Sequence, residues 1–208
     1  MRIAVLGTGV VGRVWAERLV ELGHDIVIGT RDPDAHRGEG APPLRTQAQA
    51  VMGADLVVNA LNGQATLAVL SPLADALAGV VVMDISNPLD FSAGFPPSLF
   101  VSGSDSLGEQ VQRALPRARV VKTMNTLTAS LQVHPERNPG TVFVSGDDAE
   151  AKVVVVGLLT DVGHSDIVDL GDITGSRATE SFLPLWLRLM GALGTAEFQI
   201  KVSRPVPE

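Results

Sequence analysis

The feature that most constrains the fold is the segment from Arg2 to Leu22, which reads RIAVLGTGVVGRVWAERLVEL. Its first five residues mostly favour β-structure, and they lead directly into Gly7-Thr8-Gly9-Val10-Val11-Gly12. Beyond that turn, apolar residues recur at intervals of three and four positions, which is the spacing of one helix face. The segment therefore predicts a strand, a tight glycine turn and a helix in direct succession.

In this setting the three glycines have the separate functions of a dinucleotide-binding turn. Gly7 permits the tight turn, Gly9 lets the backbone approach a pyrophosphate, and Gly12 lets the helix lie close to the strand. The free N–H groups of the first helical turn then face the anion. We therefore predict dinucleotide binding. The alternative is a strand-to-helix turn that binds nothing.

The second predicted strand, Asp25 to Gly29, indicates which nicotinamide cofactor the chain prefers. An acidic residue after this strand would bind the ribose hydroxyls and repel a 2′-phosphate, whereas this chain has Thr30 and Arg31. A hydroxyl and a guanidinium suit a phosphate group, so we predict NADP rather than NAD. The alternative is a surface ion pair between Arg31 and Asp32.

The rest of the chain repeats the strand–helix pattern, which predicts an α/β protein with a doubly wound, mostly parallel Rossmann sheet. We assign residues 1–172 to an NADP-binding Rossmann domain and residues 173–208 to a small C-terminal extension, helical over 176–193 with a bend at Pro184. The further strands are predicted over 55–60, 80–85, 119–124, 141–145, 167–170 and 197–202. The further helices are predicted over 44–52, 64–78, 107–115 and 147–162, and the second of these is interrupted or starts afresh at Ser71-Pro72.

Four turns should meet at the carboxyl edge of this sheet, where open α/β sheets bind their ligands. These turns are Gly7–Gly12, Ala60–Gly63, Ser86–Asp90 and Asn125–Thr128, and the cofactor-lining residues predicted beyond the first turn are Ala60, Leu61, Asn62, Ser86, Asn87 and Asn125. Asn87, Asn125 and Thr126 are candidates for positioning a ring, because amide and small side chains fix orientation without bulk. The alternative is that they are ordinary turn formers.

The same turns contain no evident acid–base pair, which bears on the reaction. Reduction of a ketone requires a proton donor at the alkoxide, and the candidates are Lys122, near the fourth turn, and His134. Hydride transfer between two stacked planar rings requires much less from the protein. We therefore assign no catalytic residue and expect a flavin-like acceptor, with reduction of a small carbonyl or imine as the alternative.

Two loops are candidates for covering a bound ligand. The Phe91–Phe100 segment has three phenylalanines in an aromatic-poor chain, and it could either cover a flat ligand or be tucked onto the core. His36 and Arg37 could close over the adenine, although a solvated loop is the simpler expectation for both.

Composition excludes several classes of function. The net charge of −7 and the absence of a long basic run argue against nucleic acid or an anionic membrane surface as a partner. The absence of Cys excludes disulfides, thiolate nucleophiles and Cys-ligated metals, and we expect no metal site. No apolar run reaches the roughly 18 residues needed to span a bilayer, and no signal peptide is recognisable. We therefore expect a soluble, cytoplasmic protein.

Five segments point to a known family: GTGVVG, GTR at the end of the second strand, VVKTMNT, VSGDD and the tail GSRATESFLPLWLRLMGALG. The pattern Ser-Arg-x-x-Glu-Ser-x-x-Pro over residues 176–184 is the most particular of them. Together they resemble the NADPH-dependent reductases of the deazaflavin coenzyme F420 and, more distantly, the oxidoreductase domains of six-transmembrane metalloreductases. The resemblance covers nearly the whole chain.

The resemblance implies a Rossmann domain with a small C-terminal extension, usually a homodimer, and reversible hydride transfer between NADP(H) and the deazaflavin. It also implies which residues touch the ligands: Thr8, Val10 and Val11 the pyrophosphate, Thr30 and Arg31 the 2′-phosphate, and Asn125 and Thr126 the meeting rings.

The chain departs from the archaeal members of this family at two turns. SNPLDF replaces their turn after the fourth strand, and MNT replaces a His-containing turn after the fifth. Both turns flank the acceptor site, so coenzyme F420, FMN and FAD all stay open as the second substrate. Arg177 could reach the acidic tail of the coenzyme or pair with Glu180. A non-catalytic NADPH sensor that reports to a partner protein is a further alternative.

Overall fold

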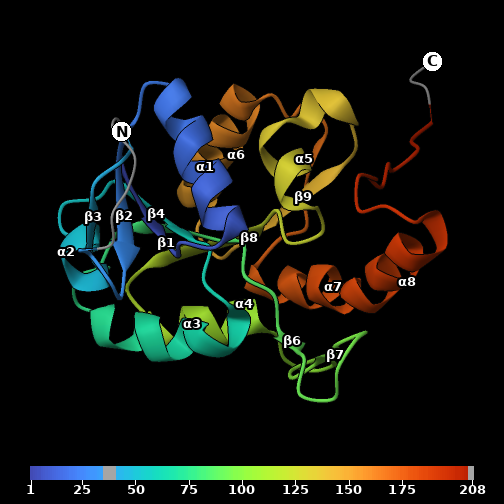
Figure 1. The fold of residues 1–208 in the computed structure, drawn as a ribbon, viewed down its shortest axis with the longest axis horizontal. Coiled ribbons are helices and arrows are strands. Elements are labelled where there is room, and N and C mark those ends of the chain that lie inside the picture. Colours follow the sequence, from blue (N-terminus) through green and yellow to red (C-terminus); the bar gives the residue numbers. More distant parts are fainter. Residues whose placement is uncertain (35–40, 206–208) are drawn as a thin grey trace.

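The computed structural model describes residues 1–34 and 41–205, and its central element is a sheet that has eight strands within these residues. From one edge to the other the strands are β10 (Ile167–Asp169), β9 (Val142–Ser145), β8 (Arg119–Thr123), β5 (Val81–Asp84), β4 (Leu56–Asn59), β1 (Arg2–Leu6), β2 (Asp25–Thr30) and β3 (Leu44–Thr46) (Figure 1).

The strands from β3 to β8 in this series all run parallel. Their chain order across the sheet is that of a Rossmann fold, with the topological switch point between β1 and β4. At the far edge β9 pairs antiparallel with β8, and β10 runs parallel to β9. The predicted fold class, a doubly wound and mostly parallel sheet, is confirmed.

Helices cover both faces of the sheet (Figure 1). One face packs against α1 (Val10–Glu21), α5 (Ala129–Val133) and α6 (Ala149–Val162), and the other against α2 (Gln47–Val51), α3 (Gly63–Leu70) and α4 (Leu107–Ala114). Strand β1 contributes Val5 to the first core and Leu6 to the second. A strand buried on both faces has no polar side to present, which explains why it reads as a continuous apolar run.

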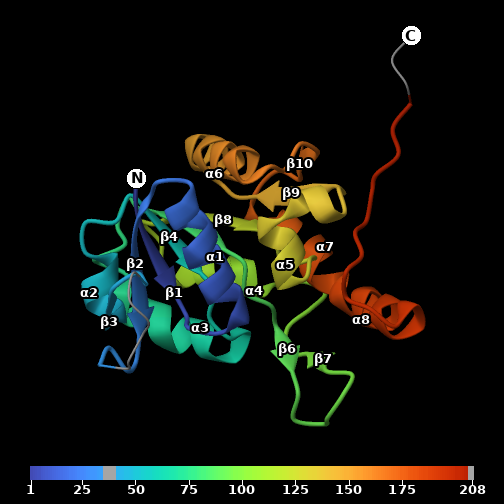
Figure 2. The same ribbon diagram turned by 45° about the horizontal axis from the view of Figure 1, so that its top comes forward.

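The C-terminal extension begins with α7 (Ser176–Ser181) and α8 (Leu183–Leu193). Pro184 lies in the first turn of α8, where its missing N–H costs nothing, so the predicted bend falls at the junction of the two helices. Strands β6 (Leu89–Asp90) and β7 (Ser98–Leu99) form a separate hairpin that projects from the body in both views (Figures 1 and 2). The Phe91–Phe100 segment is therefore not tucked onto the core, and the side chain of Phe95 is 67% exposed.

The predicted interruption of the helix over 64–78 at Ser71-Pro72 is confirmed: α3 ends at Leu70, and a 3₁₀ turn, Ser71–Leu73, follows. Two other element predictions are wrong in part. The helix predicted from Leu44 begins only at Gln47, since Leu44–Thr46 pairs with β2 as an edge strand. Residues 197–202 do not form a strand; their backbone makes two separate hydrogen bonds with Thr141.

Candidate functional site

In the glycine turn after β1, neighbouring backbone leaves no space for a side chain at Gly7 and Gly12, whereas the space beside Gly9 is free. Gly7 has φ +117°, and a Cβ there would lie 2.6 Å from the backbone oxygen of Ala60. A Cβ on Gly12 would lie 2.2 Å from the backbone oxygen of Gly7, whereas one on Gly9 would meet nothing within 4 Å. Gly7 and Gly12 are thus required by the packing of the chain on itself, while the backbone at Gly9 is open to a ligand.

Helix α1 starts at this open position. Gly9 is its N-cap residue, and in the part of the chain that the structure describes no side chain caps the start of the helix. The N-terminus of a helix carries a partial positive charge and unpaired N–H donors, which together suit an anion. The turn and the helix start therefore fit the pyrophosphate of a dinucleotide.

The end of β2 presents the two residues predicted to select NADP. Thr30 is buried, and its hydroxyl oxygen accepts a hydrogen bond from the backbone N–H of Asp32 at 3.2 Å. Arg31 is exposed, and the ion pairs of residues 1–34 and 41–205 include none between Arg31 and Asp32. The predicted positions of His36 and Arg37 lie outside the described residues.

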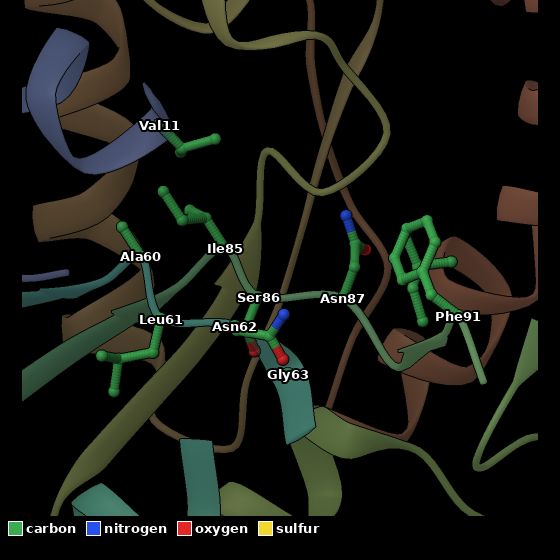
Figure 3. Close-up of a pocket in the computed structure, with 10 residues that line it drawn as sticks. Val11, Ala60, Leu61, Asn62, Gly63, Ile85, Ser86, Asn87 and Phe91 are labelled. Atoms are coloured by element: carbon green, nitrogen blue, oxygen red, sulfur yellow. The ribbon is translucent and has the colours of Figure 1, made fainter. Parts of the chain in front are cut away.

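Residues from three of the predicted turns line one cavity of about 160 Å³ at the switch point (Figure 3). Its lining consists of Val11, Ala60, Leu61, Asn62, Gly63, Ile85, Ser86, Asn87, Leu89 and Phe91. The second and third turns touch here, since a Cβ on Gly63 would lie 1.9 Å from the backbone oxygen of Asn87. Asn87 and Phe91 stand next to each other at the side of this cavity toward the β6–β7 hairpin (Figure 3).

A buried charge cluster lies directly beneath these turns. The Nζ of Lys122 donates to Asp84 Oδ2 at 3.0 Å, to Glu180 Oε1 at 2.9 Å and to the backbone oxygen of Ser86 at 2.6 Å. The side chains of Lys122 and Asp84 are 0% exposed and that of Glu180 is 2% exposed. We call Asp84, Lys122 and Glu180 the buried charge cluster.

The carboxylates of the cluster are fully hydrogen-bonded to surrounding elements. Asp84 Oδ1 accepts from Asn59 Nδ2 at 2.7 Å and from the backbone N–H and hydroxyl of Ser86 at 3.1 and 2.7 Å. Glu180 accepts from the backbone N–H groups of Leu107 and Gly108 at 2.7 and 2.9 Å, which are the first donors of α4. The cluster therefore ties the ends of β4, β5 and β8 to α4 and α7.

Lys122 is held in its charged form. Burial by itself lowers the pKa of Lys122, but the carboxylates of Asp84 and Glu180 outweigh it and raise the pKa above its ordinary value. With three acceptors around Nζ and no exposed surface, the ammonium has no path to a substrate. The hypothesis that Lys122 is a general acid is therefore not supported by its geometry.

Two predicted ring-positioning residues are joined to each other and to the extension. Asn87 Nδ2 donates to the backbone oxygen of Asn125 at 3.1 Å, and Asn125 Nδ2 donates to Asn87 Oδ1 at 3.2 Å and to the backbone oxygen of Thr179 at 3.1 Å. The amide of Asn125 thus links the turn after β5, the turn after β8 and helix α7.

The turn that carries Asn125 is strained. Met124 precedes it with φ +57°, a left-handed conformation that is uncommon for a non-glycine residue and clusters at functional sites. Buried Gln132 stabilises this conformation, since its Nε2 donates to the backbone oxygens of Met124 and Leu127 at 3.0 and 3.2 Å. The Oε1 of Gln132 accepts from Trp15 Nε1 at 2.7 Å, which joins the turn to α1.

Thr126, which follows Asn125 in the same turn, lines a second cavity with a volume of about 230 Å³. Apolar side chains and two threonines line it, from the strained turn, β9, α7 and the C-terminal segment: Thr126, Phe143, Leu170, Ala178, Thr179, Phe182 and Ile200. Thr126 therefore does not share the first cavity with Asn87. The first cavity has several polar lining residues, Asn62, Ser86 and Asn87, whereas the polar residues of the second are its two threonines.

The predicted Arg177–Glu180 ion pair is wrong. Arg177 Nε donates to Glu109 Oε2 at 2.8 Å, while Glu180 turns inward to the buried charge cluster. Two residues on one helical turn can pair only if neither finds a better partner in the fold, and here both do. His134 is the C-cap residue of α5 and lines neither cavity, and its Nδ1 is 3.2 Å from Glu136 Oε1.

Sequence reasoning did not predict the function of four buried side chains that hold the turns at the carboxyl edge of the sheet in place: Asp84, Glu180, Gln132 and Asn59. Asp84 carried a signal, because an acidic residue in the apolar run VVVMDI must find a partner when the strand is buried on both faces. Among residues 1–34 and 41–205, no three metal-ligating side chains come together. No helix in this part of the chain is long and apolar enough to cross a membrane.

The sheet order and the glycine turn at its switch point define a dinucleotide-binding protein of the Rossmann class. Residues 2–88 match the family model described as NADP oxidoreductase coenzyme F420-dependent. The F420-dependent NADP reductase of Methanocaldococcus jannaschii is 30% identical over 206 residues, which span 91% of this chain and 92% of that protein. The chain belongs to the family of F420-dependent NADP oxidoreductases, which confirms the resemblance seen in the sequence.

Two further relatives agree with this assignment. A crystal structure described as a candidate F420-dependent NADP-reductase from Arthrobacter sp. FB24 is 51% identical, with a TM-score of 0.94, and the match covers 98% of this chain and 100% of that one. Metalloreductase STEAP3 of Rattus norvegicus is 29% identical over 192 residues, which cover 89% of this chain. The match spans 38% of the length of that metalloreductase.

Proposed function

We propose that this chain transfers hydride between NADP(H) and the planar ring of a deazaflavin such as coenzyme F420. Bound NADPH supplies the hydride, and the acceptor takes it together with one proton from solvent, which leaves NADP⁺ and the reduced deazaflavin. Family membership supports both substrates, and the open backbone at Gly9 supports the dinucleotide.

The residues of the sheet edge have separate functions in this proposal. Gly9 and the N-terminus of α1 hold the pyrophosphate, and Thr30 and Arg31 hold the 2′-phosphate. Ala60, Leu61, Asn62, Ser86 and Asn87, which line the first cavity, orient the nicotinamide end of the cofactor together with Asn125, whose amide bonds to Asn87. Each of these groups binds or orients, and none has to donate a proton to the substrate.

The observation that carries the choice of acceptor is the state of Lys122. A small carbonyl needs a proton donor at the reacting oxygen, and the ammonium of Lys122 is sealed beneath the turns with all its donors used. A flavin-like ring delocalises the charge that it receives, so it does not need such a donor. The apolar cavity beside Thr126 and Phe182 suits the flat, apolar part of such a ring.

Rapid mixing tests the proposal directly. The protein is loaded with NADPH under anaerobic conditions and mixed separately with coenzyme F420, with FMN or FAD, and with a cyclic imine or ketone. We expect NADPH absorbance to be lost fastest with coenzyme F420. Turnover of FMN or FAD alone would replace the deazaflavin by a flavin as the acceptor.

The other outcomes contradict the proposal. Turnover of the imine or ketone without any flavin would show a carbonyl or imine reductase. Tight NADPH binding with no oxidation by any acceptor would show a sensor. The same rapid-mixing experiment measures both outcomes. Its absorbance traces therefore distinguish a deazaflavin reductase from a carbonyl or imine reductase and from a sensor.

The proposal extends to assembly and location. We propose a cytoplasmic homodimer in which the extension, residues 173–208, completes the acceptor site, with exposed Leu185 and Leu193 of α8 in the contact between subunits. Light scattering after size exclusion measures the mass. A monomer with full turnover would contradict the dimer and leave the hydride transfer unaffected.

A further inference from the structure

The buried charge cluster contains more negative than positive charges. It combines the ammonium of Lys122 with the carboxylates of Asp84 and Glu180, so its formal sum is one negative charge. Within residues 1–34 and 41–205, the other hydrogen-bond partners of these three side chains are neutral: the Asn59 amide, groups of Ser86, and the N–H groups of Leu107 and Gly108. The dipole of α4 offsets part of the charge on Glu180 but does not cancel a full unit.

This charge lies close to the floor of the first cavity. Asp84 is the last residue of β5, and Ser86, which lines the cavity, is two residues further along an extended chain. Ser86 also contacts the cluster directly: its hydroxyl donates to Asp84 Oδ1 at 2.7 Å, and its backbone oxygen accepts from Lys122 Nζ at 2.6 Å. The cluster is buried, so neither water nor salt screens it strongly.

We propose that the net negative charge of the cluster makes this site prefer oxidised over reduced cofactor. The nicotinamide ring is neutral in NADPH and carries a positive charge in NADP⁺. A fixed negative charge beneath the ring stabilises the cationic form, so it lowers the Kd of NADP⁺ relative to that of NADPH. The same difference makes the bound reduced cofactor a stronger hydride donor. The inference rests on the proposed function, which puts the nicotinamide beside Asn87 and Asn125.

Substitution of one carboxylate tests the effect of charge on binding. Glu180→Gln leaves a neutral Lys122–Asp84 pair, so the sum becomes zero. We expect the ratio of the Kd of NADP⁺ to the Kd of NADPH, both measured by calorimetry, to rise on the order of tenfold. For a two-electron couple, tenfold corresponds to about 30 mV in the reduction potential of the bound cofactor.

Glu109→Gln is the matched control. It is the same substitution of a buried glutamate, in the first turn of α4, whereas Glu180 lies in α7. Among the described residues Glu109 bonds to Ser106 and Arg177, neither of which lines the first cavity, so we expect its Kd ratio to stay within about twofold of the wild type. A change in ratio that is equal in both variants would overturn the inference.

A second variant covers the case in which Glu180→Gln does not fold. The triple variant Lys122→Met/Asp84→Asn/Glu180→Gln also has a sum of zero and leaves no unpaired charge in the interior, a replacement that proteins often tolerate. We expect the same direction and size of change at low and at high salt. An unchanged ratio in either folded variant would overturn the inference.

The wild type gives an independent test. We expect it to bind NADP⁺ more tightly than NADPH, and the opposite order would contradict the inference without any variant. A wild type that binds neither form would instead contradict the proposed function. The two failures are therefore distinguishable.

Discussion

The side chains of Asn87 and Asn125 are reciprocally bonded: Asn87 Nδ2 donates to the backbone oxygen of Asn125 at 3.1 Å, and Asn125 Nδ2 donates to Asn87 Oδ1 at 3.2 Å. These residues are 38 positions apart in the chain and follow adjacent strands. Asn125 is 2% exposed, and it also donates to Thr179. One amide therefore fixes the spacing between the two turns and α7, which is where the proposed rings meet.

Asn125→Ala should slow hydride transfer while leaving the affinity for NADPH nearly unchanged. The substitution removes the amide that orders both turns, and net hydrogen-bond contributions of about 1 kcal/mol predict a loss on the order of tenfold in kcat. Single-turnover kinetics measure it. Asn138→Ala, at a half-buried position near the C-terminal segment, is the control and should retain full kcat. Equal losses in the two variants would contradict the assignment.

Gly9→Ala and Gly12→Ala should separate binding from folding. A Cβ on Gly9 meets nothing in the protein, so Gly9→Ala should keep the wild-type Tm but weaken NADPH binding on the order of tenfold. A Cβ on Gly12 would collide with the backbone of Gly7, so Gly12→Ala should lower the unfolding free energy by about 2 kcal/mol or more. Thermal melts and NADPH titrations measure the two effects. A lower Tm for Gly9→Ala would contradict the conclusion that the backbone at Gly9 is open to a ligand.

Arg31→Ala should weaken NADPH on the order of 10- to 100-fold and leave NADH nearly unchanged, because the proposed contact is a charge-assisted bond to the 2′-phosphate. Arg31 is exposed, so the effect should shrink at high salt. Fluorescence titration with both cofactors measures it, with exposed Arg137→Ala as the control. Equal weakening of the two cofactors would contradict the choice of NADP.

Ala178→Phe should raise the KM for the acceptor. Ala178 lines the apolar cavity of about 230 Å³, and a phenyl ring there would occupy space proposed for the acceptor ring. We expect a rise of about tenfold in KM with an unchanged Kd for NADPH, since a buried apolar contact of this size is worth a few kcal/mol. Ala192→Phe, at an exposed position on α8, is the control. An unchanged acceptor KM would exclude this cavity from the site.

The Asp105–Arg113 pair predicts an acid-dependent stability. Hydrogen bonds from Arg113 hold the pKa of Asp105 at about 2, below its ordinary value of 3.8. Because the folded-state pKa is lowered, the stabilisation is complete above the unfolded-state pKa and is lost as pH falls from about 4 to about 2. The side chains are 60% and 30% exposed for Arg113 and Asp105, so the contribution is below about 1 kcal/mol.

Urea unfolding of Arg113→Gln measures this contribution. The variant should be less stable than the wild type near pH 6, and the difference should shrink steadily as pH falls from about 4 to about 2. Exposed Arg137→Gln should show no such trend. A difference that is constant over this range of pH would exclude the ion pair as its cause.

The parts of the fold that the sequence predicted are those determined by local chemistry. The turn Gly7–Gly12 has residues that only a tight turn and a close helix–strand approach require, so the first strand, turn and helix were recognisable in isolation. The edge strand at Leu44–Thr46 was not, since its conformation depends on pairing with β2. The absence of a strand over 197–202 has the same explanation, because alternation alone does not supply a partner.

In the candidate site, too, the features determined by local sequence were predicted and those determined by distant contacts were not. Its turns were predicted because the carboxyl ends of parallel strands must share one edge, but the side-chain partners were not. Glu180 lies three positions from Arg177, yet it pairs with Lys122, which is 58 residues away by sequence number (180 − 122). Likewise, nothing in the order of residues indicates that Gln132 stabilises the left-handed Met124. Such supports arise from tertiary packing.

The contact between Gly63 and Asn87 limits how this enzyme can be redesigned. Because the backbone of Asn87 occupies the space beside Gly63, any side chain at position 63 would push the turns after β4 and β5 apart at the base of the pocket. The β6–β7 hairpin is free of that constraint, since Phe95 extends into solvent. Libraries aimed at new electron acceptors should therefore vary the hairpin tip and keep the sheet edge constant.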